Sequence, residues 1–306
     1  MARSLLDYAI ITLKGMAMGA ADVVPGVSGG TIAFISGIYE ELIFSIDKIR
    51  PSLLIVWKKK GFTSLWNTIN GNFLLAVFMG IFISVISLAK FLSWLLDHEP
   101  VLLWSFFFGL VLASIFLVGK EIKRWNITTI IIFFLGTAIA YFITTLPPIQ
   151  NTSSLPYLFL SGALAVCAMI LPGISGAFIL VLLGSYKTIL NAVHERNFLI
   201  IGTVAIGAIF GLLSFARLLK WMFKNYHDAT LALLSGFILG SLNKIWPWKK
   251  VLETNLYDGK SIDVAFKNVL PNQFDGDAQL FASLTLAVGG FSLIFILERL
   301  AISDNS

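Results

Sequence analysis

Long apolar stretches, joined by short polar connections, run through the whole chain. Several of them reach the roughly 20 residues that a helix needs to cross a bilayer. We predict that all are helical, because an unpaired backbone cannot face lipid. The stretches cover, approximately, residues 5–21, 31–46, 72–96, 101–119, 127–146, 155–171, 174–193, 198–223, 229–243 and 279–297. The pattern therefore predicts an all-α polytopic membrane protein.

The composition agrees with this class. Of the chain 57% is hydrophobic and only 13% is charged, with a mean hydropathy of +0.86, whereas about 25% of residues are charged in soluble proteins. The first stretch carries Asp7 and Lys14 and lacks a convincing cleavage site, so we interpret it as a retained helix. Cys167 is the single cysteine, which excludes internal disulfides and cysteine-based metal sites, and we expect no metal and no cofactor.

One motif occurs twice. Pro25-Gly26-Val27-Ser28-Gly29 returns as Pro172-Gly173-Ile174-Ser175-Gly176, 147 residues later (172 − 25). The same offset pairs Gly37 with Gly184 and Tyr39 with Tyr186. A second offset of 127 pairs Gly80, Ser87, Ala89, Lys90, Trp94, Gly109 and Ser114 with Gly207, Ser214, Ala216, Arg217, Trp221, Gly236 and Ser241. We interpret the chain as an internal duplication, with a loop of 20 residues (147 − 127) present only in the first half.

The duplication predicts two membrane repeats, residues 1–147 and 148–306, within one integral-membrane domain. The segments that flank a break return the chain to its starting side, whether they are re-entrant or fully spanning, and three further spans follow. Each repeat thus crosses an effectively odd number of times, so the second must be inverted. In many transporters with inverted repeats, interrupted helices meet near the bilayer midplane and form the substrate site.

Loop charges indicate the orientation. Basic residues gather in the loops at 48–60 and 120–124, whereas the turn at 97–99 and the loop at 147–155 have none. Because lysine and arginine mark cytoplasmic loops, we expect both termini inside the cell and the long segment 244–278 outside. The net charge of +5 mostly reflects this bias and gives no reason to expect nucleic acid as a partner.

The two breaks carry the clearest chemistry. Proline removes a backbone donor and glycine permits non-helical dihedrals, so one helix should end at each break and another begin at Ser28 or Ser175. A helix start offers free N–H groups and a positive dipole end, which favour phosphate or carboxylate. The break residues are Pro25, Gly26, Pro172 and Gly173, and the expected anion-binding residues are Ser28, Gly29, Gly30, Thr31, Ser175 and Gly176.

The alternative is that these residues only kink and pack helices, as glycine pairs at four-residue spacing do. Such pairs are Gly15 and Gly19, Gly207 and Gly211, and Gly236 and Gly240. The copying of the break in both halves favours a site.

Two cations lie inside apolar stretches at equivalent positions. Lys90 and Arg217 each come four residues before a tryptophan. Because intramembrane cations are costly, we expect them to face a wet cavity or an anion, as counter-charges to the substrate. The alternative is snorkelling to an interface, since Asp97 follows Lys90 closely and Lys220 follows Arg217.

Acidic residues near the first break are candidates for proton coupling. Asp22 lies among apolar neighbours, and its counterpart in the second repeat is Met169. Glu40 and Glu41 follow the break, and an interfacial position is equally compatible with their sequence context. Acidic residues in transporter cavities commonly carry coupling protons, and Asp22 is the strongest candidate of the three.

An enzyme is disfavoured. The run Gly26-Val27-Ser28-Gly29-Gly30 fits the pattern of a serine nucleophile, but that pattern needs a preceding strand and a histidine partner. The histidines at 98, 194 and 227 lie at predicted membrane edges and lack the spacing of metal ligands. The residues by themselves indicate an anion-oriented transporter, and a channel or transporter for a small soluble anion, or a scaffold for cell-wall enzymes, remains an alternative.

The whole chain resembles the bacterial PopT family, long catalogued as a domain of unknown function. The resemblance rests on the run from Lys14 to Thr31 (KGMAMGAADVVPGVSGGT), on Leu171-Pro172-Gly173-Ile174-Ser175-Gly176 and on Gly184-Ser185-Tyr186. It implies a translocase that returns undecaprenyl phosphate, the lipid carrier of cell-wall synthesis, from the outer to the inner leaflet of the cytoplasmic membrane. The segment 244–278 has no role assigned by the resemblance.

Overall fold

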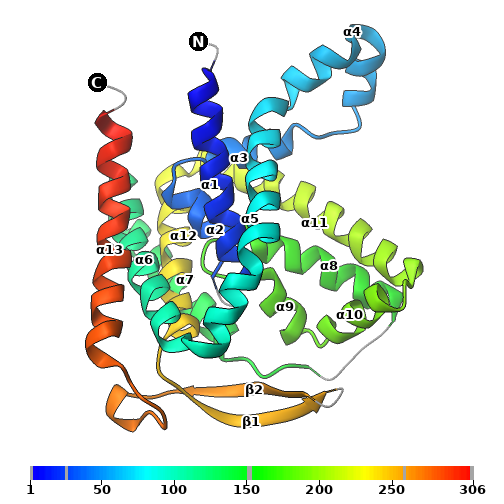
Figure 1. Cartoon of the computed structure of the whole chain (residues 1–306). Helices are drawn as coiled ribbons and strands as arrows, with labels where there is room; N and C mark the ends of the chain where they lie inside the picture. Colours follow the sequence, from blue (N-terminus) through cyan, green and yellow to red (C-terminus); the bar gives the residue numbers. More distant parts are fainter. Residues whose placement is uncertain (1–2, 25–26, 150–153, 258–259, 304–306) are drawn as a thin grey trace.

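A computed structural model describes residues 3–24, 27–149, 154–257 and 260–303. The described residues form helices and one short hairpin of strands (Figure 1). The helices are α1 (Leu5–Val23), α2 (Gly29–Ile35), α3 (Tyr39–Asp47), α4 (Leu53–Thr68), α5 (Gly71–His98), α6 (Pro100–Glu121), α7 (Ile127–Thr145), α8 (Leu155–Ile170), α9 (Gly176–Leu182), α10 (Tyr186–His194), α11 (Phe198–Asn225), α12 (His227–Ser241) and α13 (Leu280–Ser303). The prediction of an all-α polytopic membrane protein is confirmed.

Four of the described helices are long and apolar enough to cross a membrane. They contain the segments Gly71–Leu88, Pro100–Glu121, Ile127–Thr145 and Phe198–Asn225. Polar caps fix where some helices begin: the Ser4 side chain caps α1, and that of Asn126 caps α7, each in a reciprocal pair with the residue three positions later. Many large apolar side chains of the long helices are exposed, among them Phe78, Phe134 and Phe210, as contact with lipid requires.

Two segments depart from the sequence prediction. The basic loop at 48–60 contains the first half of α4, a helix that has no buried residue and is kinked at Gly61, where φ is +78°. The segment 244–278 contains an antiparallel hairpin of β1 (Lys249–Tyr257) and β2 (Lys260–Asn268), flanked by the 3-10 turns η1 (Leu242–Ile245) and η2 (Pro271–Gln273). The sequence interpretation assigned no helix to the first segment and no strand to the second, because it relied on long apolar stretches.

Equivalent helices of the two halves pack in equivalent pairs. Helix α1 lies along α5, and α8 lies along α11. The same glycines make the contacts: a Cβ on Gly15 would overlap the carbonyl of Val77, and one on Gly162 would overlap that of Val204. The offsets of 147 and 127 map the first pair onto the second. The expectation that spaced glycines pack helices is confirmed at Gly15, Gly19, Gly207, Gly211, Gly236 and Gly240.

The last helices are exchanged between the halves. Helix α7, from the first half, packs along α12, whereas α13 packs along α6. Glycines again allow close approach, with Gly136 against the Leu233 carbonyl and Gly290 against that of Phe106. Helix α6 of the first half is therefore covered by α13 of the second half, and α12 of the second half is covered by α7 of the first.

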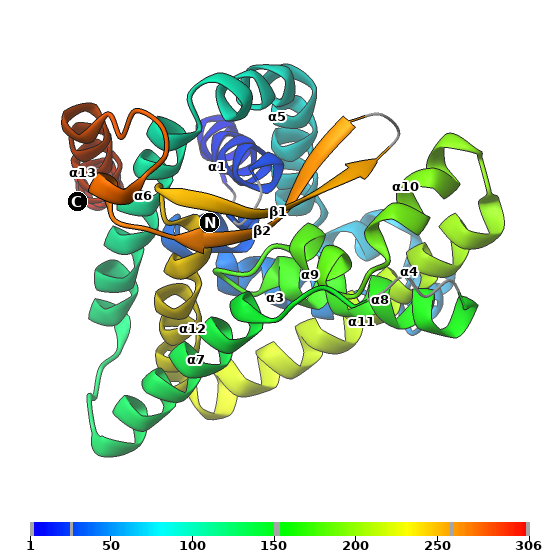
Figure 2. The ribbon, with the colours of Figure 1, turned by 90° about the horizontal axis from the view of Figure 1, so that it is seen from below.

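The bundle has two distinct ends (Figure 1). Both termini and α4 lie at one end, which we name the termini end, and the hairpin lies at the other, the hairpin end. Seen from below, the hairpin lies across its end of the bundle (Figure 2). The most completely buried side chains include Val27, before α2, Phe73 on α5, and Leu234 and Ile238 on α12.

Candidate functional site

A new helix begins at each predicted break. Ser28 is the N-cap of α2 and Ser175 is the N-cap of α9, as the sequence predicted. Each of these helices has only seven residues, and a glycine with positive φ follows two residues after its last residue, Gly37 at +74° and Gly184 at +64°. The chain then turns by 115° into α3 and by 106° into α10. Because both turns exceed a right angle, each second helix runs back against the first.

The repeated pair of Gly37 and Gly184 was the sequence signal for these turns, since glycine adopts positive φ without strain. At the first turn, the Lys14 ammonium donates to the Ser36 carbonyl over 2.6 Å. This cation ties α1 to the turn.

The two breaks meet. The backbone N–H of Gly173 donates to Thr31 Oγ1 over 2.8 Å. Ser28 Oγ lies 3.1 Å from the Met169 carbonyl and 3.2 Å from that of Leu171, at the end of α8. Residues more than 140 positions apart are thus held in one hydrogen-bonded cluster, in which Ser28 and Thr31 are buried. Ser175 is buried as well.

Asp22 occupies the anion position of the first break. Its Oδ1 accepts the N–H of Gly29 over 2.7 Å. The next N–H, of Gly30, donates to Ser28 Oγ over 3.1 Å, and that of Thr31 donates to the Ser28 carbonyl over 2.9 Å. A carboxylate at a helix start is favoured for the same reasons as a phosphate. At the first break, the Asp22 side chain therefore occupies the position that an anionic ligand would take.

The second break has no such cap. Met169 stands where Asp22 stands in the first half, and among the described residues the side chain of Ser175 makes no capping hydrogen bond at the start of α9. Gly176 lies close enough to the Ala165 carbonyl that a Cβ would sit 2.6 Å from its oxygen. Pro172 and Gly173 are buried, and Gly173 has a φ of +92°. Pro25 and Gly26 lie outside the described residues.

The first-break glycines are also packing residues. A Cβ on Gly29 would lie 2.5 Å from Asp22 Oδ2, and one on Gly30 would overlap the Ile170 carbonyl. These glycines therefore permit the close approach of α2 to α1 and α8. The two interpretations of the breaks, as packing elements and as a source of N–H donors, apply to the same residues.

Arg217 belongs to a cluster of charges at the termini end. Asp47, the last residue of α3, is buried and accepts from Lys220 over 2.7 Å and from Arg50 over 2.7 Å. Arg217 Nε lies 3.7 Å from the same carboxylate. Lys90, the counterpart of Arg217, is exposed on α5, and no ion pair joins it to another side chain among the described residues. We name Asp47, Arg50, Arg217 and Lys220 the Asp47 cluster.

Sequence reasoning missed Asp47. Its signal was a single acid directly after the apolar stretch 31–46 and before Lys48. Two of its partners, Arg217 and Lys220, come from α11, which a single sequence does not place beside α3.

Glu40 and Glu41 lie at the surface of the termini end. Glu40 Oε1 is 2.9 Å from His227 Nε2, and Glu41 receives two bonds of 2.6 Å from the guanidinium of Arg3. Asn70 also donates to Glu41, over 2.7 Å. The structure therefore places Asp22 at the breaks and separates it from the two glutamates, which contact His227 and Arg3.

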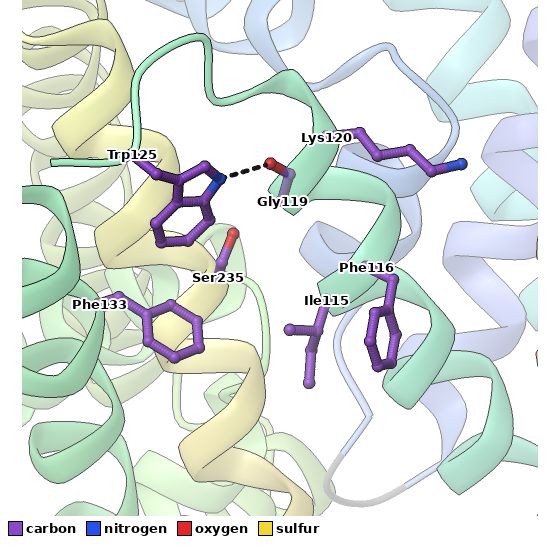
Figure 3. A pocket seen from close by; sticks show the side chains of 7 residues that line it. All are labelled: Ile115, Phe116, Gly119, Lys120, Trp125, Phe133 and Ser235. Atoms are coloured by element: carbon purple, nitrogen blue, oxygen red, sulfur yellow. Dashed lines mark hydrogen bonds between the residues drawn. The ribbon is translucent and has the colours of Figure 1, made fainter.

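A cavity of about 320 Å³ lies apart from the breaks, between α6, α7 and α12 (Figure 3). Trp125, Phe133, Phe116 and Ile115 give it apolar walls. Ser235 Oγ is buried beside it without a hydrogen-bond partner among the described residues, and Trp125 Nε1 donates to the Gly119 carbonyl over 3.2 Å. Its lining includes none of the predicted anion-binding residues.

These features define a multi-pass α-helical membrane protein in which two broken helices meet. The chain belongs to the undecaprenyl phosphate translocase-like family, whose sequence model matches residues 18–262. It is 44% identical, over 98% of this chain and 99% of the relative, to a polyprenyl-phosphate transporter of Vibrio cholerae. It is 31% identical to a polyprenyl-phosphate transporter of Staphylococcus aureus, over 77% of this chain and 85% of the relative. No solved structure matches the chain.

Proposed function

We propose that this protein moves undecaprenyl phosphate from the outer to the inner leaflet of the bacterial cytoplasmic membrane, so that the carrier is recycled for cell-wall synthesis. The names of two relatives, both polyprenyl-phosphate transporters, support the substrate class. The observation that carries the proposal is the direct contact of the two breaks, through Gly173 N–H and Thr31 Oγ1. We expect no chemical step, because translocation leaves the lipid unchanged.

The phosphate head group binds where the breaks meet. Its oxygens accept from backbone N–H groups and hydroxyls of Ser28, Gly29, Gly30, Thr31, Ser175 and Gly176, while the prenyl tail stays in lipid. The charged phosphate head needs hydrogen-bond donors, which the breaks provide, whereas the apolar prenyl tail needs none and can stay in lipid. Arg217 and Lys90 act as counter-charges on the way to and from this position.

Asp22 provides the coupling. Its carboxylate now holds the Gly29 N–H that a phosphate needs, over 2.7 Å. When Asp22 takes up a proton, it loses its charge and its hold on this donor weakens, so a phosphate replaces it. Release of the proton restores the carboxylate and expels the phosphate. Glu40 and Glu41 are further candidates for passing the proton at the termini end.

The two repeats, residues 1–147 and 148–306, are inverted relative to each other, with both termini in the cytoplasm. Support comes from the equivalent glycine contacts of α1 with α5 and α8 with α11. It also comes from the two ends of the bundle, because the termini and the basic helix α4 share one end and the hairpin lies at the other (Figure 1).

The direct test uses purified protein in liposomes and labelled undecaprenyl phosphate in one leaflet. We expect the label to reach the other leaflet at a rate far above that of empty liposomes. Rapid movement of inorganic phosphate with no movement of the lipid would establish a transporter of a soluble anion instead.

The coupling is tested by Asp22→Asn. Asparagine can still accept from the Gly29 N–H and so preserves the cap, but it cannot take up a proton. We expect normal expression and folding and a loss of at least tenfold in lipid movement. The matched control is Asp7→Asn, in the exposed first turn of the same helix, which should transport normally. Full activity of Asp22→Asn would refute the coupling.

A further inference from the structure

Two lysines come together at the root of the hairpin. Lys244 lies in the 3-10 turn after α12, and Lys249 begins β1. Both side chains are half-buried, and the Lys249 ammonium donates to the Lys244 carbonyl. Lys244 Nζ lies 4.3 Å from the ring centroid of Phe178, in α9, and so borders the helix that starts at the second break.

Aromatic rings enclose this pair. Lys249 Nζ lies 4.8 Å from the ring centroid of Trp104, on α6. Trp246 and Trp248 lie between the two lysines in the sequence. The indole N–H of Trp246 donates to the Val269 carbonyl, and that of Trp248 donates to the Ala278 carbonyl, each over 2.9 Å. The faces of aromatic rings attract cations but do not neutralise them. The two lysine side chains are therefore positioned by neighbouring aromatic rings and by a backbone carbonyl.

Neither ammonium has a carboxylate partner among the described residues, although the neighbouring Lys250 pairs with Asp275 over 3.1 Å. Burial, together with the charge of Lys244, lowers the pKa of Lys249 to about 7, and burial lowers the pKa of Lys244. Two neighbouring half-buried cations repel each other and are costly without an anion. Such an uncompensated arrangement is typical of binding sites for anions.

We propose that Lys244 and Lys249 form a binding site for a phosphate monoester at the hairpin end, where the substrate's head group is held before it reaches the breaks. The inference rests on the proposed function, because it makes this pair the first contact of the outer-leaflet lipid. A phosphate monoester carries up to two negative charges at neutral pH, which matches the two ammonium groups.

A largely apolar hollow of about 480 Å³ lies at the segment that follows β2. Its walls are Leu270, Pro271, Asn272, Ala278 and Leu280. Its Ala278 accepts the indole N–H of Trp248, the residue before Lys249. A head group at the lysines thus lies next to a surface that suits the first isoprene units, which favours a lipid phosphate over free phosphate.

The site breaks the symmetry of the duplication. The offset of 127 maps Lys244 onto Leu117 and Lys249 onto Ile122, so the first repeat has no basic residue at either position. Basic residues also lie at the termini end, in the Asp47 cluster and on α4, but the pair at the hairpin end has no carboxylate partner among the described residues and so offers a phosphate group a binding position on one side of the molecule. This asymmetry agrees with transport in one direction.

Lysine footprinting on the purified full chain tests the site without any substitution. The protein is treated with a small amine-reactive reagent, and modification of each lysine is measured by mass spectrometry. We expect undecaprenyl phosphate to reduce modification of Lys244 and Lys249 at least fivefold and to leave the exposed Lys250 unchanged. Undecaprenol, which has the same tail and no phosphate, should protect neither. Unchanged modification of both lysines by the phosphate lipid would overturn the proposal.

A competition arm distinguishes the two sources of phosphate. Inorganic phosphate should protect the pair only at concentrations at least a hundredfold above those of the lipid. Equal protection at equal concentration would assign the site to a free anion and would overturn the lipid as its ligand.

Variants separate this site from the function as a whole. The double variant Lys244→Gln, Lys249→Gln should bind undecaprenyl phosphate at least tenfold more weakly, whereas Lys250→Gln should bind it normally and Lys244→Arg, Lys249→Arg should retain binding. If wild-type protein moves the lipid and the glutamine variant binds and moves it equally well, the site is refuted and the function stands. If the lysines bind the lipid but no movement occurs, the site stands and the proposed function fails.

Discussion

The Asp47 cluster and the lysine pair at the hairpin are both basic, yet they have opposite electrostatic designs. At the termini end, three cations surround one carboxylate whose side chain is 1% exposed, while their own side chains are 35% to 59% exposed. At the hairpin end, Lys244 and Lys249 are half-buried and have no carboxylate among the described residues. The first arrangement stabilises a junction between α3 and α11, whereas the second leaves charge available to a ligand.

The difference shows that the number of basic residues is a poor guide to an anion site. What matters is which member of a cluster is buried and which is hydrated. A buried carboxylate needs its cations, so removing the acid or the bases breaks the packing. Buried cations without an acid cost stability and are compensated when an anion binds.

The comparison first requires that the clusters face opposite sides of the membrane. In a Cys167→Ser background, Lys250→Cys should react completely with an impermeant thiol reagent added to intact cells. Lys59→Cys, on the exposed helix α4, should react only after the cells are opened. This difference is all or none, and equal reaction of both cysteines from outside would remove the orientation on which the comparison depends.

Asp47→Asn should give the largest change in stability. It removes the buried charge that holds Arg50, Arg217 and Lys220, and loss of one partner of a buried pair costs about 3 kcal/mol. Because these cations reach water, we expect about 2 kcal/mol, measured as a lower midpoint of thermal unfolding in detergent. The control Asp275→Asn breaks an exposed pair and should change stability by less than about 0.5 kcal/mol. Similar midpoints for the two variants would contradict the role of Asp47.

Binding should depend on pH through Lys249. The pKa of Lys249 is about 7 in the folded protein, so its charge is lost as the pH rises above neutral. Its neighbours are the Lys244 side chain, which is basic, and the Trp104 ring. Between pH 7 and 8.5, above the second pKa of a phosphate monoester, we expect affinity for undecaprenyl phosphate to fall about tenfold. Lys249→Arg, which keeps its charge, should abolish this dependence. A tenfold fall that persists in the arginine variant would assign the titration elsewhere.

The same pKa has the opposite effect on stability. The folded-state pKa of Lys249 lies below its ordinary value of 10.5, so the unfolded chain binds more protons between pH 7 and about 10. The contribution of Lys249 to stability therefore rises with pH over this window, while ligand affinity falls. Parallel unfolding and binding titrations of wild type and Lys249→Arg separate the two effects.

The smallest effect is expected at the half-exposed pair of Glu40 and His227, whose side chains are each 42% exposed. Such pairs contribute between 0 and about 1 kcal/mol, so Glu40→Gln should leave thermal unfolding nearly unchanged. Its transport rate decides whether the residue is interfacial or takes part in coupling. Wild-type transport would restrict proton coupling to Asp22 and Glu41.

Much of the helical scaffold was predictable from apolar stretches of membrane-spanning length, and the starts of α2 and α9 were predictable from proline, glycine and serine. The turns at Gly37 and Gly184 were present in the repeat pattern but were not interpreted as turns. The hairpin and α4 were missed because both lie outside the long apolar stretches on which the prediction was based. The strand β2 does alternate, with Ile262, Val264 and Phe266 at every second position, and this short signal was not interpreted as a strand.

For the site, local chemistry was predictable and partnership was not. The sequence identified Asp22 and the glycines after the breaks, but it did not reveal that Asp22 accepts from Gly29. Lys90 and Arg217 are equivalent in sequence, yet only Arg217 meets a buried acid, because Asp47 has no counterpart beside α5. Such differences depend on contacts between segments that are distant in the chain, and these contacts could not be predicted from one sequence.

The exchange of α7 and α13 between the halves has a consequence for how the molecule is made. Neither half of the chain can complete its own packing, because α6 lacks its cover until α13, the last of the described helices, is synthesised. Two copies of an ancestral half that traded their final helices would give this connectivity directly. Separately expressed halves should therefore be unstable alone and become resistant to proteases only when produced together in one membrane.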